Sequence, residues 1–155
     1  MAGFFSTSKL TQRASSPSSG ISLCGSCGLY KHCRSPKMPP TGKGKKKILI
    51  VAEAPGEKED LKGTQLIGEA GQLLRRLLKE LDVDLDRDCW KTNSVICRPR
   101  KNATPEHEQI KACSPNVFKA IKEYNPNVII LLGGVSVQSV IGTLKNERLK
   151  SRGAW

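Results

Sequence analysis

Hydrophobic and polar positions follow two different periods along this chain, and the changes of period predict its elements. Residues 48–52 form a continuous apolar run rich in β-branched side chains, as is typical of a strand buried on both faces of a parallel sheet. Between residues 68 and 81, apolar side chains recur at spacings of three and four, which predicts a helix with one apolar stripe. The stripe consists of Ala70, Leu73, Leu74, Leu77, Leu78 and Leu81.

A second strand and a pair of helices are expected in the middle of the chain. Residues 92–97 suit a strand, which must end at Pro99 because proline has no N–H for the ladder. Thr104 followed by Pro105 is a typical helix start, with the proline at the first helical position. Ser114-Pro115 repeats this signal, so the sequence predicts a break there and a second helix that runs to Tyr124.

The last predicted elements complete an alternating order of strands and helices. The apolar run 127–132 predicts a third strand, Gly133-Gly134 a tight turn, and residues 135–141 a short helix. Strands that alternate with helices predict an α/β fold, with a central parallel sheet and helices on both of its faces.

Length and charge narrow the class of protein. A chain of 155 residues suits one domain, and its formal net charge of +12 favours a polyanionic partner such as nucleic acid. No apolar stretch is long enough to span a membrane, so no membrane partner is expected.

Residues 1–23 are rich in Ser and Thr and contain no acid, which predicts a disordered N-terminal arm before the domain at 24–155. The arm lacks the apolar run of a secretory signal. A transit peptide shares its composition, but Phe4 and Phe5 alone do not make an amphipathic helix. We therefore expect a cytoplasmic monomer.

Six cysteines without a secretory signal favour metal binding over disulfides. Cys24 and Cys27 are spaced to bind one metal or cluster from a single turn, although a zinc ribbon, a redox dithiol or a plain loop shares this spacing. Cys97 and Cys113 could supply two further ligands, and His32 could replace a thiolate. Cys89 is then expected to be a small buried hydrophobe and Cys33 an unligated loop thiol.

Five motifs, in this order and spacing, resemble the family-4 uracil-DNA glycosylases over residues 24–155. They are Cys24-x-x-Cys27 with Leu29, the segments 52–60 (AEAPGEKED), 68–74 (GEAGQLL) and 92–99 (TNSVICRP), and Cys113. The resemblance implies a uracil-DNA glycosylase-like α/β fold and a 4Fe-4S cluster on Cys24, Cys27, Cys97 and Cys113. It also implies a DNA repair enzyme that excises uracil from DNA by hydrolysing the N-glycosidic bond.

The resemblance also implies where a flipped base would bind. The amide of Asn93 can donate to uracil O4 and accept from N3–H, whereas cytosine presents the reversed pattern. Leu66 would contact the base, and the turn that contains Ala54 and Gly56 would bring backbone groups close to the base or the phosphate. The alternative for Asn93 is a structural amide at the end of a strand.

Two carboxylates are the candidates for catalysis. Glu53 follows the first strand at the carboxyl end of the sheet and could position a water against the sugar carbon, and Asp60 is the second candidate. The alternative for Glu57, Glu59 and Asp60 is a solvated acidic turn.

Two departures from the family pattern concern catalysis. The family carries Pro-Phe, whose aromatic ring stacks on uracil, where this chain has Gln65-Leu66. The family's histidine motif lies downstream of a segment like residues 151–155, so we expect a fragment of a longer reading frame that lacks the last strand. The alternative function is a catalytically deficient, glycosylase-like DNA-binding module of a phage-type or other replication protein.

Overall fold

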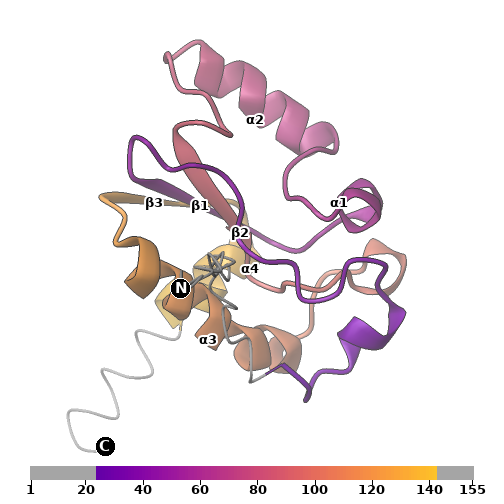
Figure 1. Cartoon of the computed structure of the whole chain (residues 1–155). Helices are drawn as coiled ribbons and strands as arrows, with labels where there is room; N and C mark the ends of the chain where they lie inside the picture. Colours follow the sequence, from indigo (N-terminus) through magenta and orange to yellow (C-terminus); the bar gives the residue numbers. More distant parts are fainter. Residues whose placement is uncertain (1–23, 143–155) are drawn as a thin grey trace, which may run out of the picture.

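The computed structural model describes residues 24–142, in which helices cover both faces of a three-stranded parallel sheet (Figure 1). The strands lie in the order β2-β1-β3, and they are β1 (Ile48–Ala52), β2 (Cys89–Asn93) and β3 (Val128–Leu131). The α-helices are α1 (Glu57–Lys62), α2 (Glu69–Lys79), α3 (His107–Tyr124) and α4 (Gly134–Val137). Three short helices complete the list: η1 (Leu29–His32), η2 (Arg100–Asn102) and the π-helical η3 (Gln138–Gly142). The predicted arm, 1–23, lies outside the described residues.

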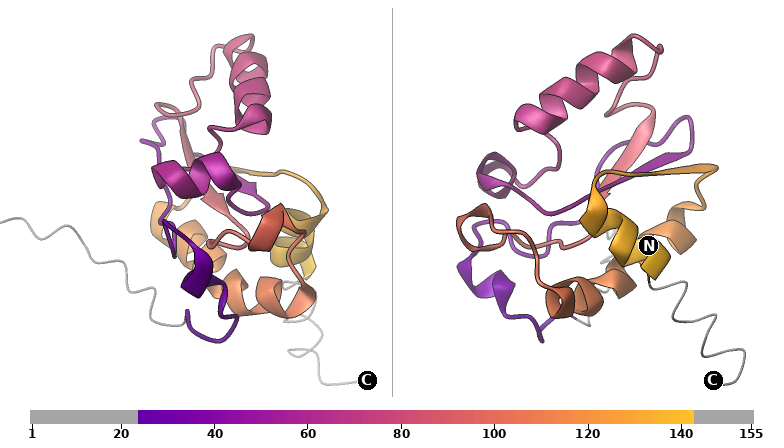
Figure 2. Two further views of the ribbon diagram at one scale, coloured as in Figure 1. Left: turned by 90° about the vertical axis from the view of Figure 1, so that its right-hand side faces the viewer. Right: turned by 180° about the vertical axis from the view of Figure 1, so that it is seen from behind.

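Strand β1 is the centre of the fold because its alternate side chains enter two different cores. Ile50 and Ala52 pack in one apolar cluster with Leu78 of α2, whereas Leu49 and Val51 pack in another with Val117 of α3. Figure 2 shows α2 on one side of the sheet and α3 with α4 on the other. The expected α/β fold with helices on both faces is confirmed.

The second strand begins and ends earlier than the sequence suggested. It covers Cys89–Asn93, and Asn93 pairs with Ala52 in the parallel register. The next two amides still bond to the neighbouring segment, Ser94 N–H to the Ala52 carbonyl at 2.7 Å and Val95 N–H to the Glu53 carbonyl at 3.0 Å. The chain then leaves the sheet, so the predicted strand at 92–97 was wrong, and Cys97 lies in the loop after the strand.

Helix α3 is continuous, and its start is Glu106 rather than Thr104. The N–H of Glu106 donates to the side chain of Gln109 at 3.0 Å, which fixes the first turn. The predicted break at Ser114-Pro115 was wrong. Pro115 cannot donate to the carbonyl of Lys111, but the hydroxyl of Ser114 donates to that carbonyl at 3.0 Å. A local side-chain bond therefore replaces the backbone bond that proline removes.

We expect Ser114→Ala to destabilise the protein by about 1 kcal/mol, because the Lys111 carbonyl then loses its donor. In a Pro115→Ala background the new N–H can bond to that carbonyl, so the same serine change should cost much less. Urea unfolding of the unaltered chain, the two single variants and the double variant measures the difference between the two costs. Equal costs in the two backgrounds would contradict the explanation.

The apolar stripe of α2 is wider than the face that packs on the sheet. Leu78 is buried and Leu74 is half-buried, but Leu73 and Leu77 are 49% and 50% exposed. The helix prediction is confirmed, while part of its stripe faces outward. Within residues 24–142, no helix combines the length and the apolar character that a membrane crossing needs.

Candidate active site and cysteine centre

Asn93 ends strand β2 directly beside β1, at the edge where ligands bind in open α/β sheets. The residue is only 2% exposed, and its side-chain Nδ2 has no hydrogen-bond partner among the described residues. Leaving a buried donor unpaired costs about 1–3 kcal/mol, so native proteins seldom retain one without a reason. The structure thus presents an amide donor that a bound molecule could satisfy.

Glu53 follows β1 at the same edge of the sheet. Its carbonyl accepts from the N–H of Val95 at 3.0 Å, which fixes the backbone next to Asn93. The residue is half-buried, and its carboxylate forms no hydrogen bond or ion pair within residues 24–142. A carboxylate that has no partner in this described part of the chain can bind water or a substrate.

The loop before α2 places Leu66 against the face of β1 that carries Ile50 and Ala52. Leu66 is 9% exposed and packs in the apolar cluster that contains Ile50 and Ala52. Its φ of 57° is unusual for a residue with a side chain. Helix α2 lies directly against its backbone, because a Cβ on Gly71 would come within 2.1 Å of the Leu66 carbonyl. This close packing holds Leu66 in its left-handed conformation.

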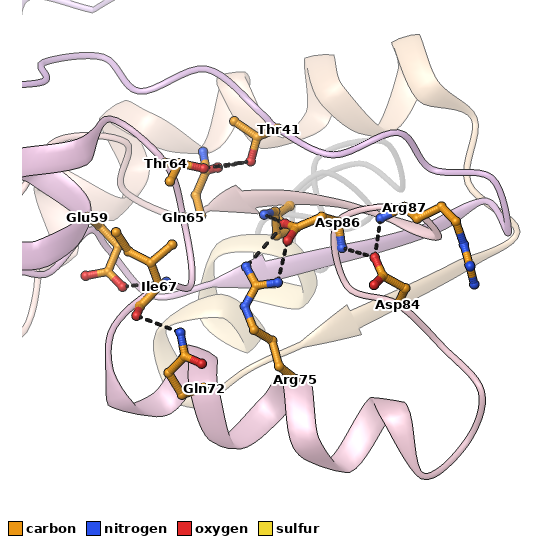
Figure 3. A network of polar contacts seen from close by, with 11 residues as sticks. Thr41, Glu59, Thr64, Gln65, Ile67, Gln72, Arg75, Asp84, Asp86 and Arg87 are labelled. Carbon is orange, nitrogen blue, oxygen red and sulfur yellow. Dashed lines mark hydrogen bonds and ion pairs between the residues drawn. The ribbon is translucent and has the colours of Figure 1, made fainter.

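Glu59 fixes the other end of that loop. Its Oε1 accepts from the N–H groups of Ile67 and Gly68 at 3.0 and 2.6 Å, and Gln72 Nε2 donates to the Ile67 carbonyl at 3.2 Å (Figure 3). The interpretation of Glu59 as a solvated charge was therefore wrong, because the carboxylate satisfies backbone donors at the start of α2. Glu57, by contrast, is exposed.

We expect Glu59→Ala to destabilise the protein by about 1–2 kcal/mol, the usual cost of a lost helix-terminal acceptor. Glu59→Gln should retain most of the stability, since its carbonyl oxygen can still accept one of the two bonds. The exposed Glu57→Ala is the matched control and should change stability by less than about 0.5 kcal/mol. Thermal unfolding of the three variants checks this, and an equal effect of both alanine variants would refute the capping role.

Ala54 and Gly56 shape the turn after β1 in a way that the sequence did not indicate. Gly56 has φ −83°, a value that any residue adopts, so its backbone conformation does not require glycine. A Cβ there would lie 2.8 Å from Oε2 of Glu59, so glycine makes room for that carboxylate. Ala54 is half-buried against the apolar cluster that contains the cysteines.

Asp60 is buried, and both of its carboxylate oxygens accept backbone hydrogen bonds. The N–H of Arg34 donates to Oδ2 at 3.1 Å, and the N–H of Ser35 donates to Oδ1 at 2.9 Å. Asp60 is therefore not part of a solvated turn. These two bonds hold the cysteine segment against α1, and the catalytic role predicted for Asp60 stays a prediction.

Gln65 is a structural residue that sequence reasoning missed. It is fully buried, its Oε1 accepts from Thr41 Oγ1 at 2.5 Å, and its Nε2 donates to the Pro39 carbonyl at 2.6 Å (Figure 3). The amide thereby ties the loop of Leu66 to the segment that follows the cysteines. Only the tertiary structure reveals these partners, which are 24 and 26 residues away.

The four predicted ligand cysteines come from three segments and meet at one apolar cluster. Cys97 and Cys113 are buried in it together with Leu29, and Cys24 and Cys27 pack against it from the N-terminal segment. Desolvation by burial raises the pKa of the Cys97 thiol to about 12 and that of Cys113 to about 11.

Two N–H groups point at sulfur atoms of this group. The backbone N–H of Lys37 lies 3.2 Å from Cys97 Sγ, and Asn116 Nδ2 lies 3.3 Å from Cys24 Sγ. Between residues 24 and 142, no three Cys, His, Asp or Glu side chains lie close enough together to hold a single metal ion. A hollow of about 450 Å³ opens beside Cys27 and Arg100, away from Asn93.

The sequence profile of the uracil DNA glycosylase superfamily matches residues 39–154. The chain belongs to the uracil DNA glycosylase superfamily. Membership agrees with the parallel sheet and its flanking helices, and the matched region contains Glu53, Asn93, Cys97 and Cys113. Cys24 and Cys27 precede that region.

The chain is similar to several type-4 uracil-DNA glycosylases. It is 40% identical over 134 residues to a type-4 uracil-DNA glycosylase of Saccharolobus solfataricus, covering 86% of this chain and 61% of that protein. A type-4 uracil-DNA glycosylase of Thermotoga maritima is 34% identical over 133 residues, covering 86% and 68%. The chain spans 54% to 68% of the lengths of its type-4 relatives.

A different kind of relative is a DNA polymerase of Bacillus phage SP01. The identity is 34% over 102 residues, which cover 64% of this chain but only 11% of the polymerase. A segment similar to this chain thus also occurs within a much longer DNA polymerase.

Proposed function

We propose that this protein is a DNA repair glycosylase, which excises uracil from DNA by hydrolysing the N-glycosidic bond. The observation that supports this most strongly is the buried Nδ2 of Asn93, which has no hydrogen-bond partner among the residues that the structure describes. With Nδ2 donating to uracil O4 and Oδ1 accepting from N3–H, one amide reads both groups of the base edge. Cytosine has a donor and an acceptor in the opposite places, so a fixed amide discriminates against it.

The other site residues supply the water and the apolar contact. The Glu53 carboxylate, which has no partner within residues 24–142, can hold a water against the sugar carbon, accept its proton as the C–O bond forms, and so assist departure of the base. Leu66 and Ala54 provide apolar surface, with Gly56 in the turn beside them. Stacking of a base on an aromatic ring stabilises binding by about 1–3 kcal/mol. Because Leu66 has no aromatic ring, we expect this chain to lack much of that stabilisation.

DNA is the proposed partner, and the base must leave the duplex to reach a donor as deeply buried as Nδ2 of Asn93. The formal charge of +12 favours binding to the phosphate backbone. We further propose that residues 24–155 form the catalytic domain, that 1–23 form an arm, and that the protein acts as a cytoplasmic monomer.

We also propose a 4Fe-4S cluster on Cys24, Cys27, Cys97 and Cys113. Two observations support this: four thiols from three segments lie within or against one apolar cluster, and N–H groups point at two of the sulfurs. The cluster would cross-link these segments and takes no part in hydrolysis. Cys97 and Cys113 would bind the cluster as thiolates, so their thiols would give up their protons on binding.

Iron and acid-labile sulfide analysis of anaerobically purified protein tests the metal proposal. We expect four irons and four sulfides per chain, as the 4Fe-4S composition requires. Stoichiometric zinc without sulfide would instead support a zinc centre and overturn the cluster.

The proposed reaction is tested with oligonucleotide duplexes that contain a single uracil. Release of free uracil, with no release of cytosine or thymine from matched duplexes, is the expected result. A second candidate function, a noncatalytic DNA-binding module, is favoured by the similarity to a phage DNA polymerase. Salt-dependent binding that shows no preference for uracil, with no base release, would support that candidate and reject the enzyme.

A further inference from the structure

The loop that carries Leu66 is tied to the strand that carries Asn93. Thr41 forms an isolated antiparallel bridge with Lys91 of β2. The Thr41 N–H donates to the Lys91 carbonyl at 3.0 Å, and the Lys91 N–H donates to the Thr41 carbonyl at 2.7 Å. Lys91 lies two residues before Asn93 on the same strand. The position of Thr41 is therefore fixed relative to the proposed base-reading amide.

Gln65 carries this connection from Thr41 to the loop. Its Oε1 accepts from the Thr41 hydroxyl (Figure 3), and its Nε2 donates to the Pro39 carbonyl, so the segment 39–41 binds both polar atoms of one amide. Gln65 is fully buried, so water does not compete for either partner. An amide whose oxygen and nitrogen are both bonded to fixed partners has one orientation, and Leu66 is the next residue along the chain.

Leu66 and Asn93 approach the same point of the sheet from different elements. Asn93 pairs with Ala52 in the parallel register, and paired residues of neighbouring strands point to the same face. Leu66 packs in the apolar cluster that contains Ala52. Its left-handed φ of 57° is unfavourable for a leucine, so surrounding contacts must hold it. Gly71 packs against its backbone, and the Gln65 amide fixes the residue before it.

We propose that Gln65 is a positioning residue for uracil, because its amide sets the place of Leu66 relative to Asn93 and thereby the affinity of the pocket for the base. This inference rests on the proposed function. Gln65 does not touch the base but acts through Leu66, whose apolar contact forms with free uracil and with a flipped uracil alike. Loss of the Gln65 hydrogen bonds lets Leu66 leave its left-handed conformation, and the contact with the base is then lost.

The affinity for free uracil tests this role, measured by equilibrium dialysis with the radiolabelled base. Gln65→Met preserves the size of the side chain but makes neither bond, and it should raise the Kd about fivefold, within the range of couplings between residues in contact. Thr41→Val, which lacks the hydroxyl, should also raise the Kd, whereas Thr41→Ser, which retains it, should bind as the unaltered chain does. Gln138→Met, the same change at an exposed glutamine of η3, is the control and should leave the Kd unchanged.

A Leu66→Ala background separates a positioning role from a merely structural one. If Gln65 acts through Leu66, Gln65→Met should weaken uracil binding in the unaltered chain but not in Leu66→Ala, whose contact with the base is already lost. Equal weakening in both backgrounds would make Gln65 a general support of the fold and would overturn the proposal. If Gln65→Met fails to fold, the half-buried Thr41 decides, and equal affinity of Thr41→Val and Thr41→Ser would reject the positioning role.

The unaltered chain distinguishes failure of this inference from failure of the proposed function. If it binds no free uracil and releases none from DNA, the proposed function is wrong, and this inference falls with it. If it binds uracil and the Gln65 and Thr41 variants bind equally well, only the positioning role is wrong.

Discussion

Asn93→Ala should lower single-turnover release of uracil by at least about a hundredfold, the usual effect of removing one fixed donor from a reaction site. The expected cause is the loss of the donor to O4 and of the acceptor for N3–H. Because Asn93 Nδ2 has no partner among the described residues, its removal breaks no protein hydrogen bond made by that atom. Thermal unfolding should therefore show much less change than activity does.

Asn93→Asp is the sharper variant, since it preserves the size of the side chain and replaces the Nδ2 donor with an acceptor. Uracil release should fall at least as far as in Asn93→Ala, because an acceptor then faces O4. Asn127→Ala, a change at an exposed asparagine outside the site, should leave release unchanged. Uracil release by Asn93→Asp at the unaltered rate would refute the base-reading role.

Asp86→Ala should destabilise the protein by about 3 kcal/mol, because it leaves a buried ammonium without its counter-charge. The Lys91 side chain lies within β2 and is only 2% exposed, and it forms an ion pair with the Asp86 carboxylate. Arg75 of α2 bonds to the same carboxylate (Figure 3), so Asp86 joins the strand to the helix. Urea unfolding measures the loss of stability.

The double variant Asp86→Ala/Lys91→Met is the control, because methionine replaces the charged chain with an apolar one that suits burial. It should recover most of the stability lost in Asp86→Ala. If it is as unstable as the single variant, the unpaired Lys91 charge is not the cause.

The same carboxylate gives a pH dependence with a defined sign. Hydrogen bonding from Arg75, followed by the bond and charge of Lys91, lowers the pKa of Asp86 from 3.8 to about 2. A group whose pKa is lower in the folded state stabilises the fold above its unfolded value. That contribution should therefore be complete above about pH 4 and vanish as the pH falls towards 2. Acid titration of the unaltered chain and of Asp86→Ala should differ in this window.

The parts of the fold that followed from sequence were those with strong local patterns. The run at 48–52 and the leucine spacing of α2 identified a buried strand and its helix without tertiary information. The boundaries of β2 and α3 did not follow, because they depend on contacts with other side chains. Ser114 closes the gap left by Pro115, and Gln109 fixes the helix start, so the proline and threonine signals were overridden.

The candidate site was only partly predictable for a similar reason. Residue type and position left Asn93 and the cysteines with structural alternatives, and their place in motifs that resemble the family singled them out. The sequence could not assign different roles to Glu53, Glu59 and Asp60 in the acidic run after β1. Their roles differ because Glu59 and Asp60 accept hydrogen bonds from backbone N–H groups, whereas the Glu53 carboxylate accepts none within residues 24–142. Those N–H groups belong to segments 8 to 26 residues away.

The central claim is that Nδ2 of Asn93 donates to the O4 of uracil, and the side-chain amide resonance of Asn93 reports on it directly. In ¹⁵N-labelled protein, that resonance is identified by its disappearance in Asn93→Asp. Titration with uracil should shift it in a saturable manner, whereas cytosine at equal concentration should not. No shift with uracil, or the same shift with both bases, would contradict the account.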